Sequence, residues 1–320
     1  MANPKESTIK KAIIAIADKR SKHPDAPRLK LAQDPKLRKI RQARNKVLVE
    51  SLQAAGLDTH RLAALGKQHD AELRRAVAKY RAEAVRRSRK RGPHYLSVLG
   101  QCKVLVDAAD QTTSVSLTKP FLIWATPRSN ILSNSQVAPS DSWAKFRVSS
   151  SGEDSYRVSF YFLWTNPYNT FVVIDPITFV IATGYIEADA DRSYLTPNVS
   201  NVSVDAEFSL WQWWLPSPEP ILSASASLGH KSAVAEYFQT DSQSESIAAG
   251  VRLDAGTFAV PASSTVVFEV AIPISFYSDS GTALADFESG NFNVACPVVA
   301  FPVVQLPFRE AWTATRRIRS

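Results

Sequence analysis

Three carboxylates alternate along one stretch of the chain, at Glu187, Asp189 and Asp191. Side chains two residues apart point to the same side of an extended strand, so the three could hold a hard cation such as Ca²⁺, which prefers oxygen ligands. The same pattern is typical of a charged strand edge that discourages pairing between sheets. Because no glycine stands at the fixed position of a known calcium loop, the sequence favours the charged edge, and we expect no metal site.

Catalytic chemistry is not indicated. Nucleophilic and acid-base mechanisms need a base beside its target, usually a histidine, and the chain has no HExxH, CxxC, GxSxG, Walker or dinucleotide-binding motif. His94 lies at the boundary between the two parts, only His230 lies inside the larger second part, and no partner for His230 can be identified in the sequence. The five histidines are His23, His60, His69, His94 and His230. We therefore expect a protein that is not an enzyme and that uses no cofactor.

A dense group of cations closes the first third of the chain. A row of guanidinium and ammonium groups can displace counterions from a phosphate backbone without reading base sequence. Such a row can equally meet an acidic protein, or be a solvated helix face whose last turn complements the helix dipole. Tyr80 is the only aromatic residue before Tyr95, so base stacking is disfavoured. The candidate residues for binding nucleic acid or an acidic partner are Arg74, Arg75, Lys79, Arg81, Arg86, Arg87, Arg89, Lys90 and Arg91.

The charge of the whole chain is divided unevenly. Residues 1–94 hold 25 Lys and Arg against 9 Asp and Glu, a net charge of +16. The remainder holds 13 against 21, a net of −8, and the two parts add to the +8 of the chain. This asymmetry predicts either a basic segment with its own partner or two parts that attract each other.

A tryptophan cluster, Trp211, Trp213 and Trp214, stands before a proline-rich run. Three indoles there could form the corner of a core or a subunit interface, a platform for a carbohydrate or hydrophobic ligand, or a belt at a membrane surface. No apolar run approaches the eighteen residues that a spanning helix needs, so we expect no stable membrane insertion.

The N-terminal part is predicted to be helical. A short amphipathic helix is expected over 10–20, with Ile9, Ile13, Ile16 and Ala17 on one stripe. A second helix is expected from Asp34, a good N-cap, to Gly56, and a third from about residue 58 to the mid-80s. The second and third together predict a helical hairpin or a coiled-coil pair.

From Tyr95 the apolar pattern changes to a period of two, and Gly92-Pro93 marks the boundary. The strand from Tyr156 to Trp164 shows the pattern best, because Val158, Phe160, Phe162 and Trp164 share one face. Asp241 to Glu245 is expected to be a loop. About ten strands are predicted, over 96–106, 114–125, 144–149, 156–164, 171–175, 179–187, 202–213, 250–253, 266–276 and 292–299.

The predicted fold class is therefore α+β, mainly β: a basic helical segment over 1–93 and an antiparallel β-sandwich of jelly-roll or Greek-key type over 94–320. The first twenty residues lack a secretory apolar region, and we expect a cytoplasmic protein. Cys102 and Cys296 are accordingly expected to be reduced core thiols.

The chain resembles uncharacterised bacterial proteins in which a charged helical part precedes a β-rich domain. The resemblance rests on FYFLWTNP at 160–167, WQWWLPSPEP at 211–220, VPASSTVVFEV at 260–270 and NVACPVV at 293–299. In outline the chain is also similar to jelly-roll coat proteins, which carry a basic arm ahead of a sandwich. This second similarity is an analogy of architecture, and fold does not fix function.

These observations together predict a non-enzymatic assembly protein. A self-associating sandwich would carry a basic helical arm that binds nucleic acid, as a coat-like protein needs. The first alternative is a protein-binding adaptor that uses the helical hairpin. The second is a membrane- or carbohydrate-binding sandwich that uses the tryptophan cluster.

Overall fold

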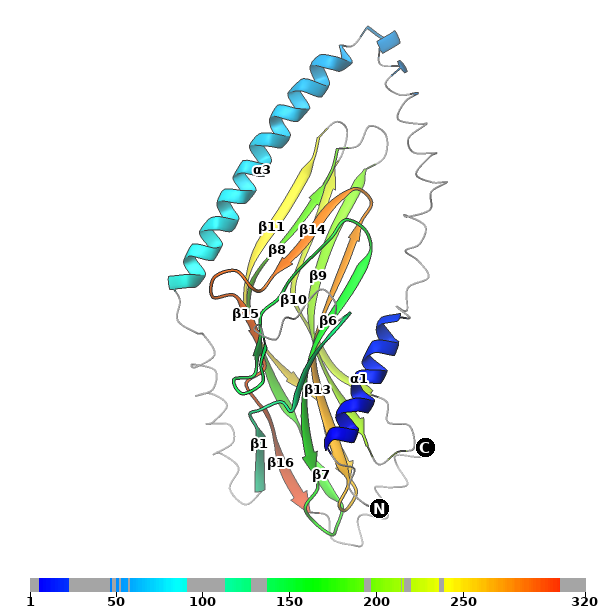
Figure 1. The fold of residues 1–320 in the computed structure, drawn as a ribbon, viewed down its shortest axis with the longest axis vertical. Coiled ribbons are helices and arrows are strands. Elements are labelled where there is room, and N and C mark those ends of the chain that lie inside the picture. Colours follow the sequence, from blue (N-terminus) through cyan, green and yellow to red (C-terminus); the bar gives the residue numbers. More distant parts are fainter. Residues whose placement is uncertain are drawn as a thin grey trace.

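The computed structural model describes residues 6–22, 47, 50–51, 53–56, 58–90, 113–127, 137–192, 197–213, 215, 220–235 and 239–305. In these residues two helices, α1 (Glu6–Lys22) and α3 (Thr59–Lys90), accompany sixteen strands arranged in two sheets. Figure 1 shows the helices on opposite sides of the strands. Neither of these helices is long and apolar enough to cross a membrane.

One sheet has five antiparallel strands in the order β10-β9-β13-β6-β2. Its central strand, β13, pairs with β6 on one side and β9 on the other. We call it the five-stranded sheet; its members are β2 (Leu122–Thr126), β6 (Asp154–Thr165), β9 (Asn198–Gln212), β10 (Pro220–Ala235) and β13 (Thr265–Ser278).

The other sheet has eleven strands of different lengths, all antiparallel to their neighbours. Its strand β8 (Ile177–Ala190) pairs with more neighbours than any other member. β8 pairs with β11 (Asp241–Asp254) along one edge and with β14 (Gly281–Asp286), β15 (Asn293–Ala295) and β16 (Val299–Gln305) along the other. The remaining members are β1 (Thr113–Leu117), β3 (Val137–Ala138), β4 (Trp143–Ala144), β5 (Arg147–Ser150), β7 (Val172–Ile174) and β12 (Phe258–Val260).

The main hydrophobic core lies between the two sheets. Phe160 and Phe162 of β6 and Phe208 of β9 are fully buried in it, together with Val180 and Ile186 of β8. These residues come from the apolar faces that the period-two pattern predicts. The antiparallel, mainly β prediction is confirmed, and the two packed sheets form a β-sandwich.

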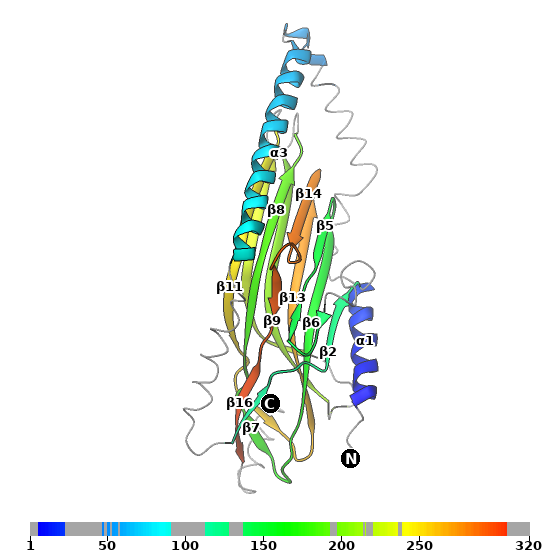
Figure 2. The same cartoon turned by 60° about the vertical axis from the view of Figure 1, so that its left-hand side comes forward.

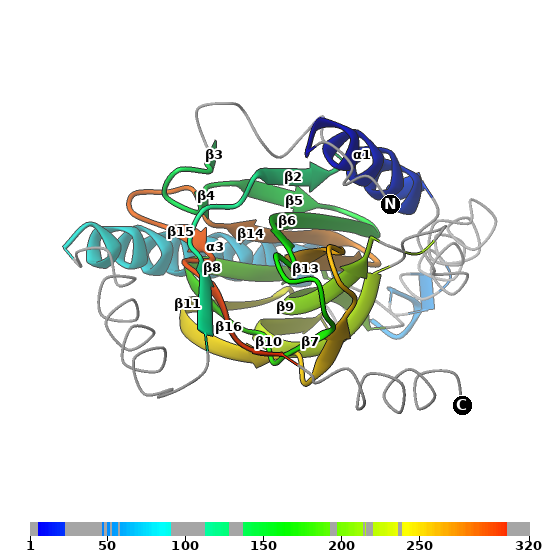
Figure 3. The same ribbon diagram turned by 90° about the horizontal axis from the view of Figure 1, so that it is seen from below.

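The helices pack on the outer faces of the sandwich. Figure 2 shows α1 beside β2 of the five-stranded sheet and α3 along β8 and β11 of the other. Seen from below, α1 again lies outside β2 (Figure 3). The predicted helical hairpin is not confirmed, because most of its first helix, expected over 34–56, lies outside the described residues. In the structure α3 packs against the sandwich and not against a second helix of the described residues.

Several strand predictions were wrong in detail. The stretch 114–125 forms two strands, because Pro120 interrupts it and lacks the N–H that a ladder needs. β10 was not predicted, because its alternating Ser and Ala residues carry little apolar contrast. Asp241 to Glu245, expected to be a loop, begins β11 and pairs with β8. The strand expected over 96–106 lies outside the described residues.

Candidate functional site: the interface between helix α3 and the sandwich

α3 is fixed to the sandwich by a small apolar cluster. Ala84 and Tyr185 are buried in it with Leu284 and Phe292, and Val85 packs against them. Tyr80 adds a ring contact with Tyr185, with the centroids 6.2 Å apart. The cluster forms because Ala84 and Val85 lie one turn beyond Tyr80 and Arg81 on the same helix face. The C-terminal half of α3 is therefore a packed part of the domain.

The end of α3 rests on the turn after β14. Gly290 has a φ of +65°, and a Cβ there would lie 3.0 Å from Ser88 Oγ and 3.2 Å from Val85 Cγ1. Asn291 Nδ2 donates to the carbonyl oxygens of Ser88 and Arg89, at 3.3 and 3.4 Å. These are the last carbonyls of the helix, which have no partner within it, so the turn caps α3.

A buried ion pair joins the two parts. Arg81 Nη2 donates to Asp286 Oδ2 at 2.6 Å, and the Asp286 side chain is fully buried. Burial opposes ionisation of Asp286, but hydrogen bonds from the side chain and backbone of Ser289, from the Glu288 backbone and from Arg81 outweigh it and lower its pKa. The guanidinium of Arg81 also lies 5.8 Å from the ring centre of Tyr185. Arg81 is therefore a docking residue in this structure, and its predicted binding of an external partner stays a prediction.

Two further contacts lie nearer the start of α3. Asp70 accepts hydrogen bonds from Arg192 and from Thr240, the latter at 2.7 Å. Arg74 Nη2 lies 3.8 Å from Asp191 Oδ1, with its side chain three-quarters exposed. The basic and acidic parts of the sequence thus attract each other within the chain, because the basic helix α3 faces Glu187, Asp189 and Asp191.

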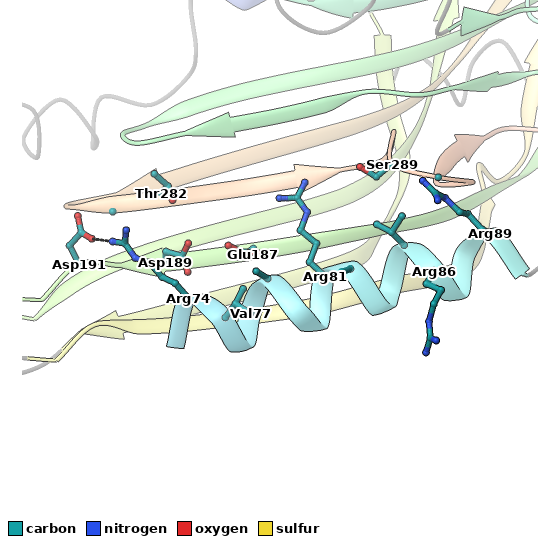
Figure 4. Close-up of a pocket in the computed structure, with 15 residues that line it drawn as sticks. Arg74, Val77, Arg81, Arg86, Arg89, Glu187, Asp189, Asp191, Thr282 and Ser289 are labelled. Carbon is teal, nitrogen blue, oxygen red and sulfur yellow. Dashed lines mark ion pairs between the residues drawn. The ribbon is translucent and has the colours of Figure 1, made fainter. Parts of the chain in front are cut away.

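Between these contacts an open groove with a volume of about 990 Å³ runs between α3 and the strands. Figure 4 shows Arg74 and Arg81 extending from the helix toward the strands, Glu187 and Asp189 on the facing strand β8, and Asp191 just beyond its end. Thr282 of β14 lines the same space. The groove thus has one wall with cations and one with carboxylates.

Glu187 has an unusual environment in this groove. Burial, reinforced by the neighbouring Asp189, raises its pKa to about 6, although Tyr185 Oη donates a hydrogen bond to it at 2.8 Å and opposes the shift. Asp189 in turn accepts a hydrogen bond from Ser242. No cluster of three metal-ligating side chains occurs among the residues that the structure describes. The alternating carboxylates line the open groove, and β8 is paired with β11 on one side and with β14 on the other, so they do not form the free strand edge that the sequence favoured.

The other predicted cations that the structure describes are exposed. Arg75, Lys79, Arg86, Arg87 and Arg89 are exposed. Arg87 pairs with Glu83 at 2.6 Å on the helix surface, and Arg86 lies 3.8 Å from the same carboxylate. The side chain of Lys90 and the whole of Arg91 lie outside the described residues. We call the side of α3 that carries Arg75, Lys79, Arg86 and Arg87 its outer face. Arg86 lies at the border of the groove, and Arg89 lines the groove itself.

The tryptophan cluster lies on the far side of the sandwich beneath α1. Ile9 and Ile13 of α1 are buried against Trp211 and Tyr161 of the five-stranded sheet, and Trp213 is half-buried beside them. Asp18 accepts a hydrogen bond from Trp124 Nε1 at 3.2 Å. Trp211 is fully buried, so it cannot act as an open ligand platform in this structure, and Trp214 lies outside the described residues.

A buried carboxylate organises the sheet face beneath α1. Glu269 is 1% exposed and accepts hydrogen bonds from Ser159, Tyr161 and Trp211, at 2.9, 3.1 and 3.0 Å. Arg157 pairs with it at 3.2 Å. Glu269 was not among the predicted site residues. A lone carboxylate in the apolar run from Val266 to Ile274 was nevertheless a detectable sign, because a buried charge needs partners.

No protein-family model and no curated protein matches the sequence. Solved structures with some similarity include the carbohydrate-binding module TmCBM61 in complex with β-1,4-galactotriose, with a TM-score of 0.18, 7% identity, and coverage of 59% of this chain and 91% of that one. The xylan-binding domain from CBM22 has a TM-score of 0.23 and 9% identity, and coverage is 62% of this chain and 100% of that one. The mannan-recognising module TmCBM27 has a TM-score of 0.22 and 11% identity, and coverage is 61% of this chain and 96% of that one. These scores are too low to indicate a shared family or ligand.

Proposed function

We propose that the protein is a non-enzymatic binding protein in which the sandwich holds α3 rigidly and its outer face binds a polyanion, foremost nucleic acid. The observation that carries this proposal is the division of the helix into two faces. Arg81 on the inner face is neutralised by buried Asp286. Arg75 and Lys79 on the outer face have no ion pair with a carboxylate among the described residues, and they remain available.

The spacing of the outer cations suits a phosphate backbone. Arg75 and Lys79 are one turn apart, and Arg86 follows seven residues later on the same side of the helix. Eleven residues of α-helix span about 16 Å, a length over which duplex DNA presents roughly ten phosphates. Binding would not depend on base sequence, because phosphate contacts position a protein without reading bases.

Self-association belongs to the same proposal, as a coat-like protein would need both properties. The tryptophan face is covered by α1, so the contact between copies would involve other surfaces. Light scattering coupled to size-exclusion chromatography, with the ratio of absorbance at 260 and 280 nm, measures both the mass of the particle and any nucleic acid that accompanies it.

A protein-binding adaptor is the second candidate, and the inner face of α3 favours it. That face already binds an acidic protein surface, the row of β8 and Asp286. An acidic partner could be bound by the outer face through the same kind of contact.

The test is fluorescence anisotropy of a labelled DNA duplex with the full chain at 50, 100 and 200 mM salt. If about six phosphates are neutralised, affinity should fall roughly a thousandfold over this range. Replacing Arg75, Lys79, Arg86 and Arg87 by Gln should weaken binding and reduce the salt slope by up to about four. Lys119→Gln, an exposed cation on the loop between β1 and β2, is the matched control and should change little.

Absence of duplex binding at 50 mM salt would refute the nucleic-acid proposal. Binding of poly-L-glutamate under the same conditions, with the same loss in the quadruple variant, would then support the adaptor. A salt slope that the four substitutions leave unchanged would place the binding surface elsewhere and refute the role of the outer face.

A further inference from the structure

The groove on the inner side of α3 is a second candidate binding site, distinct from the outer face. We propose that this groove binds a neutral oligosaccharide, whose hydroxyl groups bridge the helix and the strands. This inference goes beyond the proposed function, since it concerns a different surface and an uncharged ligand.

The two walls of the groove carry opposite kinds of hydrogen-bonding group. The helix wall offers the guanidinium donors of Arg74 and Arg89, and the strand wall offers the carboxylate acceptors of Glu187, Asp189 and Asp191. Arg74 and Asp191 lie 3.8 Å apart, which is too long for a hydrogen bond. Each of these two groups can therefore bond to a molecule placed between the walls.

A hydroxyl group matches both walls at once. It donates one hydrogen bond and accepts others, so it can donate to a carboxylate of β8 while it accepts from a guanidinium of α3. Glu187 and Asp189 already accept from Tyr185 and Ser242, and a carboxylate has about four acceptor positions. Charged ligands fit less well, because a phosphate would face the three carboxylates and a cation would face the arginines.

The floor of the groove and its size agree with a sugar chain. Val77, Ala78, Ala82 and Val85 present a small apolar strip along α3 between the polar walls. The C–H faces of sugar rings can cover such a strip, while the ring hydroxyls reach the walls. The volume of about 990 Å³ is at the upper end of the usual range for small-molecule sites.

The test is isothermal titration calorimetry of the full chain with three neutral probes: cellohexaose, xylohexaose and mannohexaose. We expect at least one to bind with saturable heat at concentrations up to about 10 mM, since sites of a few hydrogen bonds reach the millimolar range. If none of the three produces saturable heat, the proposal is overturned.

Variants locate the binding site. Ala78→Leu fills the groove and should weaken the bound probe at least tenfold, whereas Ala76→Leu, also exposed on α3 but not part of the groove lining, should not. Thr282→Val keeps the shape but removes a hydroxyl, and loss of one hydrogen bond corresponds to about a fivefold loss of affinity. Equal affinity in Ala78→Leu and Ala76→Leu would show binding elsewhere and overturn the proposal.

The two surfaces are tested independently. The outer-face substitutions at Arg75 and Lys79 should leave sugar binding unchanged, and Ala78→Leu should leave duplex binding unchanged. Sugar binding that disappears when only Arg75 and Lys79, which lie outside the groove lining, are replaced would overturn the assignment to the groove. Failure of duplex binding alone would refute the proposed function without touching this inference.

Discussion

At the scale of single residues, Glu187 shows how the surroundings of a carboxyl group change its pKa. Its alternation with Asp189 and Asp191 is visible in the sequence, but the groove beside α3, which all three line, is not. The resulting burial raises the pKa of Glu187 to about 6. A raised pKa means that the folded protein binds this proton more tightly than the unfolded chain, so Glu187 destabilises the fold once pH rises through 6.

Glu187→Gln should therefore stabilise the protein at pH 7.5 and have little effect near pH 4.5. A pKa of about 6 corresponds to about 2 kcal/mol at most, and solvent screening in the open groove reduces this to about 1 kcal/mol. Urea unfolding at both pH values measures the difference in free energy of unfolding. A variant that is less stable at pH 7.5 would show that attraction to Arg81 and Arg74 exceeds the effect of burial.

The strand β6 shows what residue patterns could and could not predict. Its even-numbered face, with Phe160 and Phe162, was correctly expected to be buried. The other face, with Ser159 and Tyr161, is polar enough in sequence to suggest solvent, but both side chains are buried. Their hydroxyls bond to Glu269 from β13, more than 100 residues away, and no local pattern reveals such a partner.

At the scale of secondary-structure elements, the periodicity of 58–84 predicted α3 but not its orientation. Leu65 and Tyr80 are among the apolar residues that recur at spacings of three and four in this stretch, and yet about half of each side chain is exposed. The apolar contact between α3 and the sandwich lies in the last two turns of the helix, at Ala84 and Val85. The position of Gly290 beneath them depends on the turn after β14, so it could not be derived from the helix sequence.

Gly290→Ala should loosen the end of α3. The positive φ disfavours alanine by about 1 kcal/mol, and contact of the new Cβ with Ser88 and Val85 should add about as much again. Gly256→Ala is the matched control, because Gly256 has a φ of +73° and open space around it. Chemical denaturation should show the larger loss for Gly290→Ala, and trypsin should cleave faster within 86–90. Equal losses would mean that the contact with α3 is weak.

At the scale of the whole molecule, composition predicted a basic first third and a β-rich remainder, and the structure adds that each described helix covers one sheet. The division at residue 93 stays a prediction. The main core contains no residue of α1 or α3, which favours independent folding of the sandwich. The aromatic faces beneath the helices would then be open to water.

The fragment 94–320 should accordingly unfold cooperatively, but at lower urea concentration than the full chain. It should also bind a hydrophobic dye such as anilinonaphthalene sulfonate, because Trp211 and Tyr185 lose their covers. Circular dichroism and dye fluorescence measure the two properties. A fragment without a cooperative transition would show that the helices belong to a single folding unit and that the division is wrong.

The position of α1 over the indoles gives the molecule a built-in optical reporter. Of its seven tryptophans, Trp211 is sealed beneath the helix, and Trp124 and Trp213 pack partly buried beside it. Indole emission moves to longer wavelength when water reaches the ring. Departure of α1 would thus change the intrinsic emission spectrum, while movement of α3, which packs on Tyr185 and not on these indoles, would leave that spectrum nearly unchanged. The two sides of the sandwich can be followed separately, without any attached dye.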